Sequence, residues 1–303
     1  KVLGDFKTNE DYMPYFHSLK KNCVTGYTYA SIVGGQTANT EFELLTGNTL
    51  GFLSAGTTAF QLYIHGQMPS LVSNLKAEGY SGNKAMHPFN PYNYNRPAVY
   101  KDFGFTDFID KFDFPKNVKR VREYISDEAN VDRIISEYEK NRKKTDQPFY
   151  MYNMTIQNHS PYDKDAANFK QPIKIESSKY DAEANRYLNL IKYSDDSLKQ
   201  LTSYFEKCKE PTIILFLGDH QPRLTDEFMN KITNGQYQTW SSEQMMKRYQ
   251  VPFVIWANYD IKEQHIEKTS MNYIQSILTK TAGVKMTGYQ RFLNEVRKEV
   301  PTI

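Results

Sequence analysis

The most informative segment of the chain is an apolar run that ends in a glycine, an aspartate and a histidine: Thr212-Ile213-Ile214-Leu215-Phe216-Leu217-Gly218-Asp219-His220. A run that is apolar at every position is typical of a strand buried on both faces of a parallel sheet. A turn after such a strand can aim two adjacent side chains inward, so Asp219 and His220 are predicted ligands of a divalent metal ion. The carboxylate suits Mg²⁺ or Mn²⁺, and the imidazole suits Mn²⁺ or Zn²⁺. The alternative is an aspartate that caps the next helix beside a surface histidine.

Strand and helix patterns alternate along the rest of the chain. Apolar runs predict further strands over residues 80–86, 149–156 and 251–257. Helical periodicity predicts helices over residues 67–79, 127–143, 180–208, 269–281 and 289–300, the second with Asp127 as its N-cap. The alternation predicts an α/β fold in which a mostly parallel central sheet carries helices on both faces.

Two polar segments follow predicted strands of this sheet. Asn158-His159 comes after residues 149–156, and Asp219-His220 comes after residues 212–217. Ligands of such sheets bind outside the carboxyl ends of the strands, so we expect both segments to share one site. Residues 85–105 are rich in proline, asparagine and tyrosine and are predicted to be largely loop, as is the polar stretch 164–178.

A second informative segment, Gly34-Gly35-Gln36-Thr37-Ala38-Asn39-Thr40-Glu41, is typical of a tight loop that opens a helix. The N-terminus of a helix attracts anions such as phosphate, and the glycines let the backbone approach a substrate closely. Thr37 is therefore a predicted nucleophile for metal-assisted attack on a phosphorus or sulfur ester. The alternative is that Thr37 only caps the helix, and Thr40 is the rival hydroxyl.

Three other side chains are candidates for contacts with an anionic substrate. His159, in Asn158-His159-Ser160-Pro161, can donate to an anionic oxygen or protonate a leaving group. Arg96 can clamp phosphate oxygens, and both Arg96 and His87 lie in the predicted 85–105 loop, with Tyr94 nearby. The alternatives are structural histidines and an arginine that faces solvent.

The composition restricts the class of protein. A chain of 303 residues can form one large α/β domain or two small ones. Its net charge of +3 is too small to indicate a nucleic-acid partner. Two cysteines provide neither a disulfide framework nor a zinc cluster. No apolar run is long enough to cross a bilayer, and because the chain opens on Lys1, we expect a fragment whose anchor or export signal lies outside it.

The motifs resemble those of lipoteichoic acid synthases, in the sulfatase-like branch of the alkaline phosphatase superfamily. The shared motifs, in order, are Gly35-x-Thr37-x-x-x-Glu41-Phe42, His87 with Tyr94-Asn95-Arg96, Asn158-His159-Ser160-Pro161 and Gly218-Asp219-His220. The resemblance covers about residues 13–257. It implies a single sulfatase-like catalytic domain over residues 1–303. The part from about residue 258 is expected to be helical and peripheral. A membrane anchor and a first strand are expected to precede the chain.

The resemblance also implies a function. Such enzymes transfer glycerol phosphate from phosphatidylglycerol to a polymer or glycolipid acceptor, on the extracytoplasmic face of the membrane in a Gram-positive-type envelope. They use a covalent threonine intermediate and Mn²⁺, with Mg²⁺ or Zn²⁺ as other options. By this resemblance Thr37 is nucleophile and metal ligand, and Asp219 and His220 are metal ligands. The implied phosphoglycerol-binding residues are His87, Tyr94, Arg96 and His159, with Tyr94 standing where these synthases often have a tryptophan.

The sequence departs from the pattern of lipoteichoic acid synthases at one ligand of the metal site. The family has a metal-binding glutamate at the end of its first strand, and neither Asp5 nor Glu10 follows an apolar strand. The metal site is therefore expected to be incomplete in residues 1–303. Three other functions stay open: a phosphoethanolamine transferase, which typically carries several disulfides, a phosphodiesterase on the same fold, and a catalytically silent cell-surface binding domain. A sulfatase is disfavoured because a Cys/Ser-x-Pro-x-Arg run is missing around Thr37.

Overall fold

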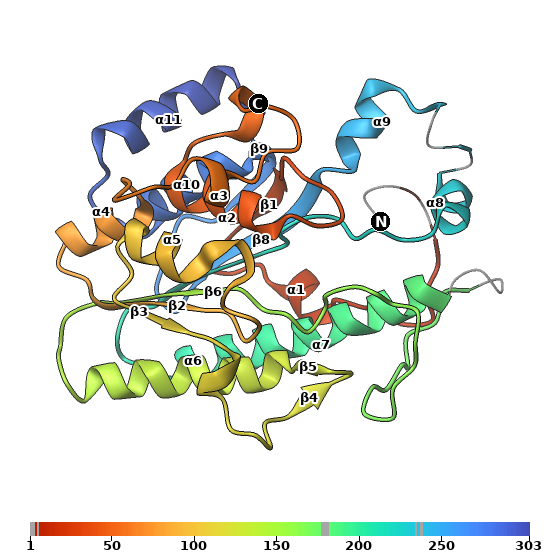
Figure 1. The fold of residues 1–303 in the computed structure, drawn as a ribbon, viewed down its shortest axis with the longest axis horizontal. Helices are drawn as coiled ribbons and strands as arrows, with labels where there is room; N and C mark the ends of the chain where they lie inside the picture. Colours follow the sequence, from red (N-terminus) through yellow and green to blue (C-terminus); the bar gives the residue numbers. More distant parts are fainter. Residues whose placement is uncertain (1–3, 5, 177–181, 234, 237–238) are drawn as a thin grey trace.

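The structure, a computed structural model, describes residues 4, 6–176, 182–233, 235–236 and 239–303. Its strands form a four-stranded sheet in the order β7-β8-β1-β9, a three-stranded sheet in the order β3-β2-β6, and the hairpin β4-β5 (Figure 1). The strands are β1 (Cys23–Tyr29), β2 (Ser81–Met86), β3 (Asp107–Ile109), β4 (Arg120–Val121), β5 (Tyr124–Ile125), β6 (Phe149–Asn153), β7 (Ile213–Leu217), β8 (Gln250–Ala257) and β9 (Gln264–Ser270).

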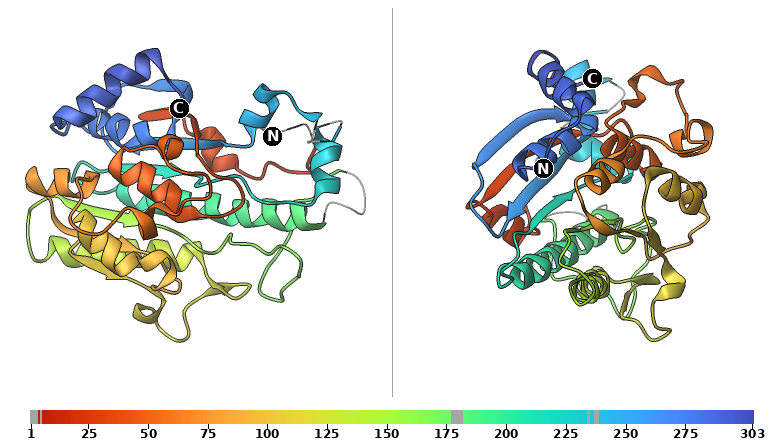
Figure 2. Two further views of the ribbon diagram at one scale, coloured as in Figure 1. Left: turned by 45° about the horizontal axis from the view of Figure 1, so that its top comes forward. Right: turned by 90° about the vertical axis from the view of Figure 1, so that its left-hand side faces the viewer.

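The helices cover both faces of these sheets. They are α1 (Pro14–Ser18), α2 (Thr37–Thr46), α3 (Ala59–Leu62), α4 (Leu71–Ala77), α5 (Arg96–Phe103), α6 (Asp127–Arg142), α7 (Ala182–Phe205), α8 (Asp226–Ile232), α9 (Ser242–Lys247), α10 (Ile274–Thr281) and α11 (Gly288–Glu299). Helices α6 and α7 lie side by side (Figure 1), and the right-hand view of Figure 2 shows this pair nearly end-on below the strands. In the described residues, no helix combines the length and the apolar character that a bilayer span requires.

Strand β8 shows how the four-stranded sheet is buried on both faces. Phe253 and Ile255 belong to the largest core cluster, which also includes Phe42 of α2. Val254 and Trp256 belong to a second cluster with side chains of α7. Alternate residues of a strand point to opposite faces, so β8 contributes to two cores at once. The predicted α/β class, with helices on both faces, is thus confirmed.

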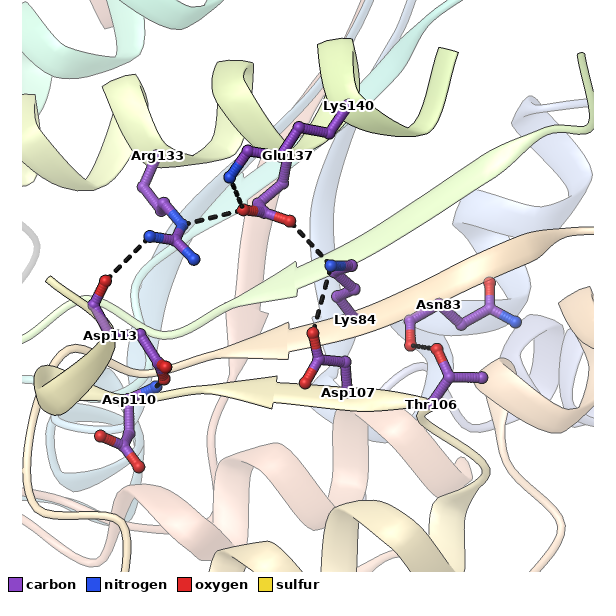
Figure 3. Close-up of polar contacts among 9 residues, drawn as sticks. All are labelled: Asn83, Lys84, Thr106, Asp107, Asp110, Asp113, Arg133, Glu137 and Lys140. Carbon is purple, nitrogen blue, oxygen red and sulfur yellow. Dashed lines mark hydrogen bonds and ion pairs between the residues drawn. The ribbon is translucent and has the colours of Figure 1, made fainter. Parts of the chain in front are cut away.

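An ion-pair cluster fastens α6 to the three-stranded sheet (Figure 3). The buried carboxylate of Glu137 contacts Lys84 of β2 at 2.7 Å, Lys140 at 2.8 Å and Arg133 at 3.0 Å. Burial alone would raise the pKa of Glu137, but the hydrogen bonds from Lys140 and Lys84 lower it to about 2. Lys84 also contacts Asp107 of β3 at 3.1 Å. The cluster thereby holds α6 against β2, the strand that leads to His87.

Strands β6 and β7 each have one edge without a partner strand among the described residues. β6 pairs with β2 in parallel, and β7 pairs with β8 antiparallel. Residues of both strands and of the loops that follow them line one cavity of about 1300 Å³. The five apolar residues of β7 are accordingly only half-buried. The cavity therefore runs from the space beside these strands to their carboxyl ends.

Several local predictions are confirmed and others are wrong. The four predicted strands correspond to β2, β6, β7 and β8, but the four-stranded sheet is mixed because β8 runs antiparallel to both its neighbours. The pattern missed β1 and β9, which pair in parallel. Gly26 interrupts the apolar character of β1, and a Cβ there would lie 2.1 Å from the Ile266 carbonyl oxygen. A glycine in a strand often marks such a close approach of two backbones.

Three boundaries also differ from expectation. Residues 258–303 are not only helical and peripheral, since β9 lies in the sheet and Met271 and Tyr273 are in the main core. Helix α6 is capped by Ser126, whose hydroxyl accepts from the Ala129 N–H, and Asp127 is its first residue. The 85–105 stretch contains helix α5, because Val99, Tyr100 and Phe103 recur at helical spacing and are buried in the core. Residues 180 and 181 of the predicted 180–208 helix lie outside the described residues.

Candidate functional site

Thr37, Asp219 and His220 converge on one point. The Thr37 hydroxyl donates to Asp219 Oδ2 at 2.8 Å and lies 3.5 Å from His220 Nε2. His220 Nε2 in turn lies 3.2 Å from Asp219 Oδ2. The turn after β7 thus presents both side chains to the first residue of α2. The predicted proximity of these three groups is found, although Thr37 lies 182 residues before Asp219 in the chain.

The start of α2 explains why the Thr37 hydroxyl is available. The N-cap of α2 is Gln36, in a left-handed conformation without a side-chain capping bond, and Thr37 is the first helical residue. Thr37 is therefore not the N-cap. Gly34 adopts a φ of +72°, and its N–H donates to the Gln221 carbonyl at 2.9 Å. A Cβ on Gly34 would lie 3.0 Å from the Cβ of Arg223, so glycine lets the two loops meet.

Thr40, the rival hydroxyl, has a structural role. Its side chain is buried, and its hydroxyl donates to the backbone carbonyl of Asp219 at 2.8 Å. Thr37 and Thr40 lie one turn apart on α2, so they bind the same residue from one helix face. The bond from Thr40 orients the backbone of Asp219, and the bond from Thr37 reaches its carboxylate.

The three histidines of the site share one arrangement. The Nδ1 atoms of His87, His159 and His220 lie 2.9, 2.6 and 2.9 Å from the backbone carbonyls of Met154, Ser160 and Gln221. A carbonyl only accepts hydrogen bonds, so Nδ1 carries a proton in each ring. Nε2 of each histidine is therefore available to a ligand. A backbone carbonyl, rather than an acidic side chain, sets the orientation of each imidazole ring.

His87 is the most perturbed of these groups. It follows β2, its side chain is buried, and burial together with the nearby charge of Arg96 lowers the pKa of His87 to about 4. His87 is consequently neutral at physiological pH. With the proton on Nδ1, its Nε2 can accept a hydrogen bond from a hydroxyl but cannot donate one to an anionic oxygen.

His159 lies in an aromatic setting at the mouth of the cavity. Its ring is stacked on Phe89, with centroids 6.3 Å apart, and lies 5.9 Å from the ring of Tyr124. The side chain is exposed, in contrast to that of His87. The Phe89 ring also contacts His87, at 6.0 Å between centroids, so the two predicted histidines flank the same aromatic side chain.

The location of Arg96 differs from the predicted loop. It is the first residue of α5, almost inaccessible to solvent, and its guanidinium contacts Glu41 Oε1 through Nη2 at 2.5 Å and Nε at 3.1 Å. Tyr100 donates to the other oxygen of Glu41. The Tyr94 ring lies under the guanidinium at 5.1 Å. Arg96 is therefore fixed by a buried ion pair with the helix that carries Thr37, and Glu41 is a site residue that the motif analysis left without a role.

All seven predicted site residues line the 1300 Å³ cavity: Thr37, His87, Tyr94, Arg96, His159, Asp219 and His220. Their donor chemistry fits a divalent cation in part. One carboxylate, one imidazole and one hydroxyl converge, which are oxygen and nitrogen ligands that Mn²⁺ or Zn²⁺ accept. Nowhere in the described part of the chain do three or more His, Cys, Asp or Glu side chains form a group that could hold a metal ion. The converging donors thus make a partial ligand set.

Fold and site together define a class: an α/β domain in which a helix-initial threonine faces an Asp-His pair at the end of a strand. The chain belongs to the sulfatase family, whose model matches residues 3–284. This assignment confirms the recognised superfamily branch and its fold.

Three known proteins illustrate the relationship. A putative cyclic beta-1,2-glucan modification protein of Rhizobium meliloti is 33% identical over 302 residues, which are 97% of this chain and 45% of the relative. The Streptococcus pyogenes phosphoglycerol transferase GacH, solved with sn-glycerol-1-phosphate, matches with a TM-score of 0.82 and 20% identity, over 99% of this chain and 75% of that one. The lipoteichoic acid synthase LtaP of Listeria monocytogenes matches with a TM-score of 0.73 and 22% identity, over 95% and 70%.

These likenesses support the resemblance to lipoteichoic acid synthases that the motifs indicated. At such identities the two solved structures show a shared fold. The chain spans less than half the length of the curated relatives it matches.

Proposed function

We propose that this chain is the catalytic domain of a phosphoglycerol transferase that uses Thr37 as its nucleophile. The observation that carries the proposal is the hydrogen bond from the Thr37 hydroxyl to Asp219, beside Nε2 of His220. A threonine held this way at a helix N-terminus combines an acceptor for its proton with a region that attracts phosphate. The fold shared with GacH and LtaP supports the same conclusion.

The reaction has two balanced steps. In the first, Thr37 Oγ1 attacks the phosphorus of phosphatidylglycerol, the bond from phosphorus to the diacylglycerol oxygen breaks, and diacylglycerol leaves with a proton. In the second, an acceptor hydroxyl attacks the phosphorus of the glycerophosphoryl group and passes its proton to Nε2 of His159. The bond from phosphorus to Thr37 Oγ1 breaks, and Thr37 recovers its proton from Asp219. The Nδ1–H of His159 is bound to the Ser160 carbonyl, which leaves Nε2 for the substrate. In its doubly protonated form, His159 donates the Nε2 proton to the departing oxygen in the first step.

The glycerol headgroup is proposed to bind on the β2 and α5 side of the cavity. Neutral His87 accepts a hydrogen bond from a glycerol hydroxyl through Nε2. Arg96, fixed by Glu41, contributes positive charge to the phosphate region, and Tyr94 packs over the guanidinium. Because Glu41 already occupies Arg96 Nε and Nη2, the contribution of Arg96 to phosphate binding is mainly electrostatic.

Thr37, Asp219 and His220 are the residues proposed to hold a divalent cation, with Mn²⁺ preferred and Mg²⁺ or Zn²⁺ as alternatives. Such an ion, when bound, stabilises the threonine alkoxide and the charge that develops on phosphate oxygens. We propose that the ligand set is completed by a further carboxylate, on a strand that pairs with the open edges of β6 and β7. The catalytic domain then acts on the extracytoplasmic face of the membrane, where its lipid donor is.

The acceptor is a hydroxyl of a glycerol-phosphate polymer or a glycolipid. A specific observation adds a second candidate, a glucan, because the rhizobial relative that matches 97% of the chain is described as a glucan modification protein. The rival phosphoethanolamine transferase is disfavoured, since Cys23 and Cys208 are both free thiols.

The test uses the natural full-length protein in detergent micelles with Mn²⁺ and fluorescent phosphatidylglycerol. Release of fluorescent diacylglycerol and a glycerophosphoryl group on the peptide that contains Thr37 are the expected results. The same assay with fluorescent phosphatidylethanolamine separates the two transferases. Turnover of phosphatidylethanolamine alone would show that the donor assignment is wrong, and no turnover of either lipid would favour a silent binding domain.

A further inference from the structure

The hairpin β4-β5 carries an arginine in an unusual backbone conformation. Arg122 follows β4 and has a φ of +55°, in the left-handed region that favours glycine. A two-residue hairpin turn would accommodate glycine at this position with less strain. Residues held in such a conformation are maintained by contacts around them, which raises the question of what the Arg122 side chain binds.

The guanidinium of Arg122 binds the loop that carries His159. Its Nη2 donates to the carbonyl oxygens of Gln157 and His159, and its Nη1 donates to the carbonyl oxygen of Pro161, each at 2.7 Å. The planar fork of an arginine suits such multiple bonds, whereas a lysine ammonium lacks this geometry. One side chain therefore fixes three carbonyls within five consecutive residues.

The two intervening carbonyls point to other partners. The Asn158 carbonyl accepts from the Tyr162 hydroxyl at 2.9 Å. The Ser160 carbonyl lies 2.6 Å from His159 Nδ1 and accepts from the Tyr124 hydroxyl at 3.3 Å. Since the carbonyls of residues 157, 159 and 161 are held by Arg122, the orientation of the Ser160 carbonyl toward the imidazole is a consequence of that arrangement.

The hairpin turn is itself anchored from a second segment. The Arg122 N–H donates to Asn168 Oδ1 at 3.1 Å, and Asn168 Nδ2 donates to the carbonyls of Arg122 and Arg120 at 3.0 and 3.1 Å. The guanidinium also lies over the rings of Tyr124 and Tyr162, at 5.2 and 5.9 Å. The contacts of the Arg122 guanidinium are thus with carbonyl oxygens and aromatic rings.

We propose that Arg122 is a positioning residue that sets the tautomer and orientation of His159. By holding the 157–161 loop, it turns the Ser160 carbonyl to Nδ1, so that neutral His159 carries its proton there and directs Nε2 to the substrate. The expected effect of Arg122 on catalytic turnover rests on the proposed function, whereas its effect on the tautomer of the His159 imidazole does not. Arg122 acts through His159 and touches no reacting atom.

The informative variant is Arg122→Gly, because glycine suits the left-handed turn and removes the guanidinium without adding backbone strain. Nitrogen NMR of the His159 ring, assigned by comparison with His159→Gln, reports the tautomer. We expect the Nδ1–H form in the wild type, a mixture of both tautomers in Arg122→Gly, and a return toward the Nδ1–H form when guanidinium chloride is added at millimolar concentration. Arg122→Lys should resemble the glycine variant, since an ammonium lacks the planar fork whose two Nη atoms reach the three carbonyls.

Arg120→Ala is the matched control. Arg120 lies in the same hairpin, and among the described residues its side chain donates to the Glu123 carbonyl at 2.9 Å, away from the His159 loop, so its loss should leave the His159 spectrum unchanged. In the full-length enzyme, Arg122→Gly should lower kcat for phosphatidylglycerol about 10- to 100-fold with a smaller effect on KM, the range found when groups that orient an active-site ligand are removed. Guanidinium should restore part of this loss.

Two results would overturn the proposal. One is an Nε2–H tautomer in the wild-type protein, a measurement that needs no variant. The other is an unchanged His159 tautomer in folded Arg122→Gly. If even the wild type does not turn over phosphatidylglycerol, the proposed function fails, while the tautomer still decides the role of Arg122.

Discussion

Arg96 and Glu41 form a buried ion pair that joins the nucleophile helix to the substrate-binding segment. Glu41 lies one helical turn after Thr37 on α2, and Arg96 opens α5; the two side chains are 0% and 2% exposed. Breaking a buried pair leaves an uncompensated charge in a medium of low polarity. The pair therefore couples the position of Thr37 to that of Tyr94 and Arg96, and its disruption should affect both stability and substrate binding.

Glu41→Gln tests this coupling through stability. The substitution leaves the Arg96 charge without its partner, so we expect the free energy of unfolding to fall by about 3–5 kcal/mol, the usual cost of breaking a buried pair. Urea denaturation followed by circular dichroism measures it. The matched control is Asp146→Asn, which removes the exposed partner of Arg142 and should change stability by less than about 1 kcal/mol. Similar effects of the two substitutions would contradict the assigned role of Glu41.

Thr37→Ala tests the nucleophile. The variant loses one part-buried hydrogen bond, so its stability should fall by only about 1 kcal/mol. Its transferase rate should fall about a thousandfold or more, because no covalent intermediate can form. Thr40→Ala is the comparison: it loses a part-buried bond to the Asp219 carbonyl and should retain most of the activity. Turnover by Thr37→Ala close to that of the wild type would rule out Thr37 as the nucleophile.

Metal binding should be weak in residues 1–303. Three converging donors are fewer than Mn²⁺ usually takes, and affinity follows the number and charge of the ligands. Calorimetric titration with MnCl₂ should give weak binding that Asp219→Asn reduces about tenfold or more. Glu137→Gln, which alters a carboxylate in the α6 cluster instead, should not change the Mn²⁺ isotherm. Tight stoichiometric binding by residues 1–303 would mean that another described carboxylate completes the site.

The lowered pKa of His87 leads us to expect that the stability of the protein depends on pH. An unfolded histidine has a pKa near 6.5, and that of folded His87 is lowered to about 4. Between these values the unfolded chain binds the proton and the folded protein does not, so stability falls as the pH drops from about 6.5 to about 4. A shift of this size corresponds to about 3 kcal/mol.

The measurement is the difference between wild type and His87→Gln in urea denaturation at several pH values. Subtraction is needed because burial raises the pKa of Asp127 to about 6, which gives a contribution of the opposite sign in the same range. The free energy of unfolding of the wild type minus that of His87→Gln should decrease as the pH falls toward 4. Parallel curves for the two proteins would show that His87 does not titrate as described.

Local sequence determined much of the framework. The apolar runs gave the strands β2, β6, β7 and β8, and the glycine-rich loop indicated the helix that begins at Thr37, because periodicity and turn residues act over a few neighbouring positions. The positions of Asp219 and His159 after strands β7 and β6 followed from the same local signals. So did the recognition of the sulfatase-like family, since its motifs are short and ordered.

Tertiary structure alone decided how these parts meet. No local sequence pattern indicates three features: the polar strand β9, the burial of Arg96 and the hydrogen bonds from Arg122 to the His159 loop. Each of them depends on a partner far away in the chain. The same holds for the 2.8 Å bond from Thr37 to Asp219. Residue patterns specify which elements form, but the pairing of charges and hydroxyls depends on the distances that packing imposes, and those distances define the site.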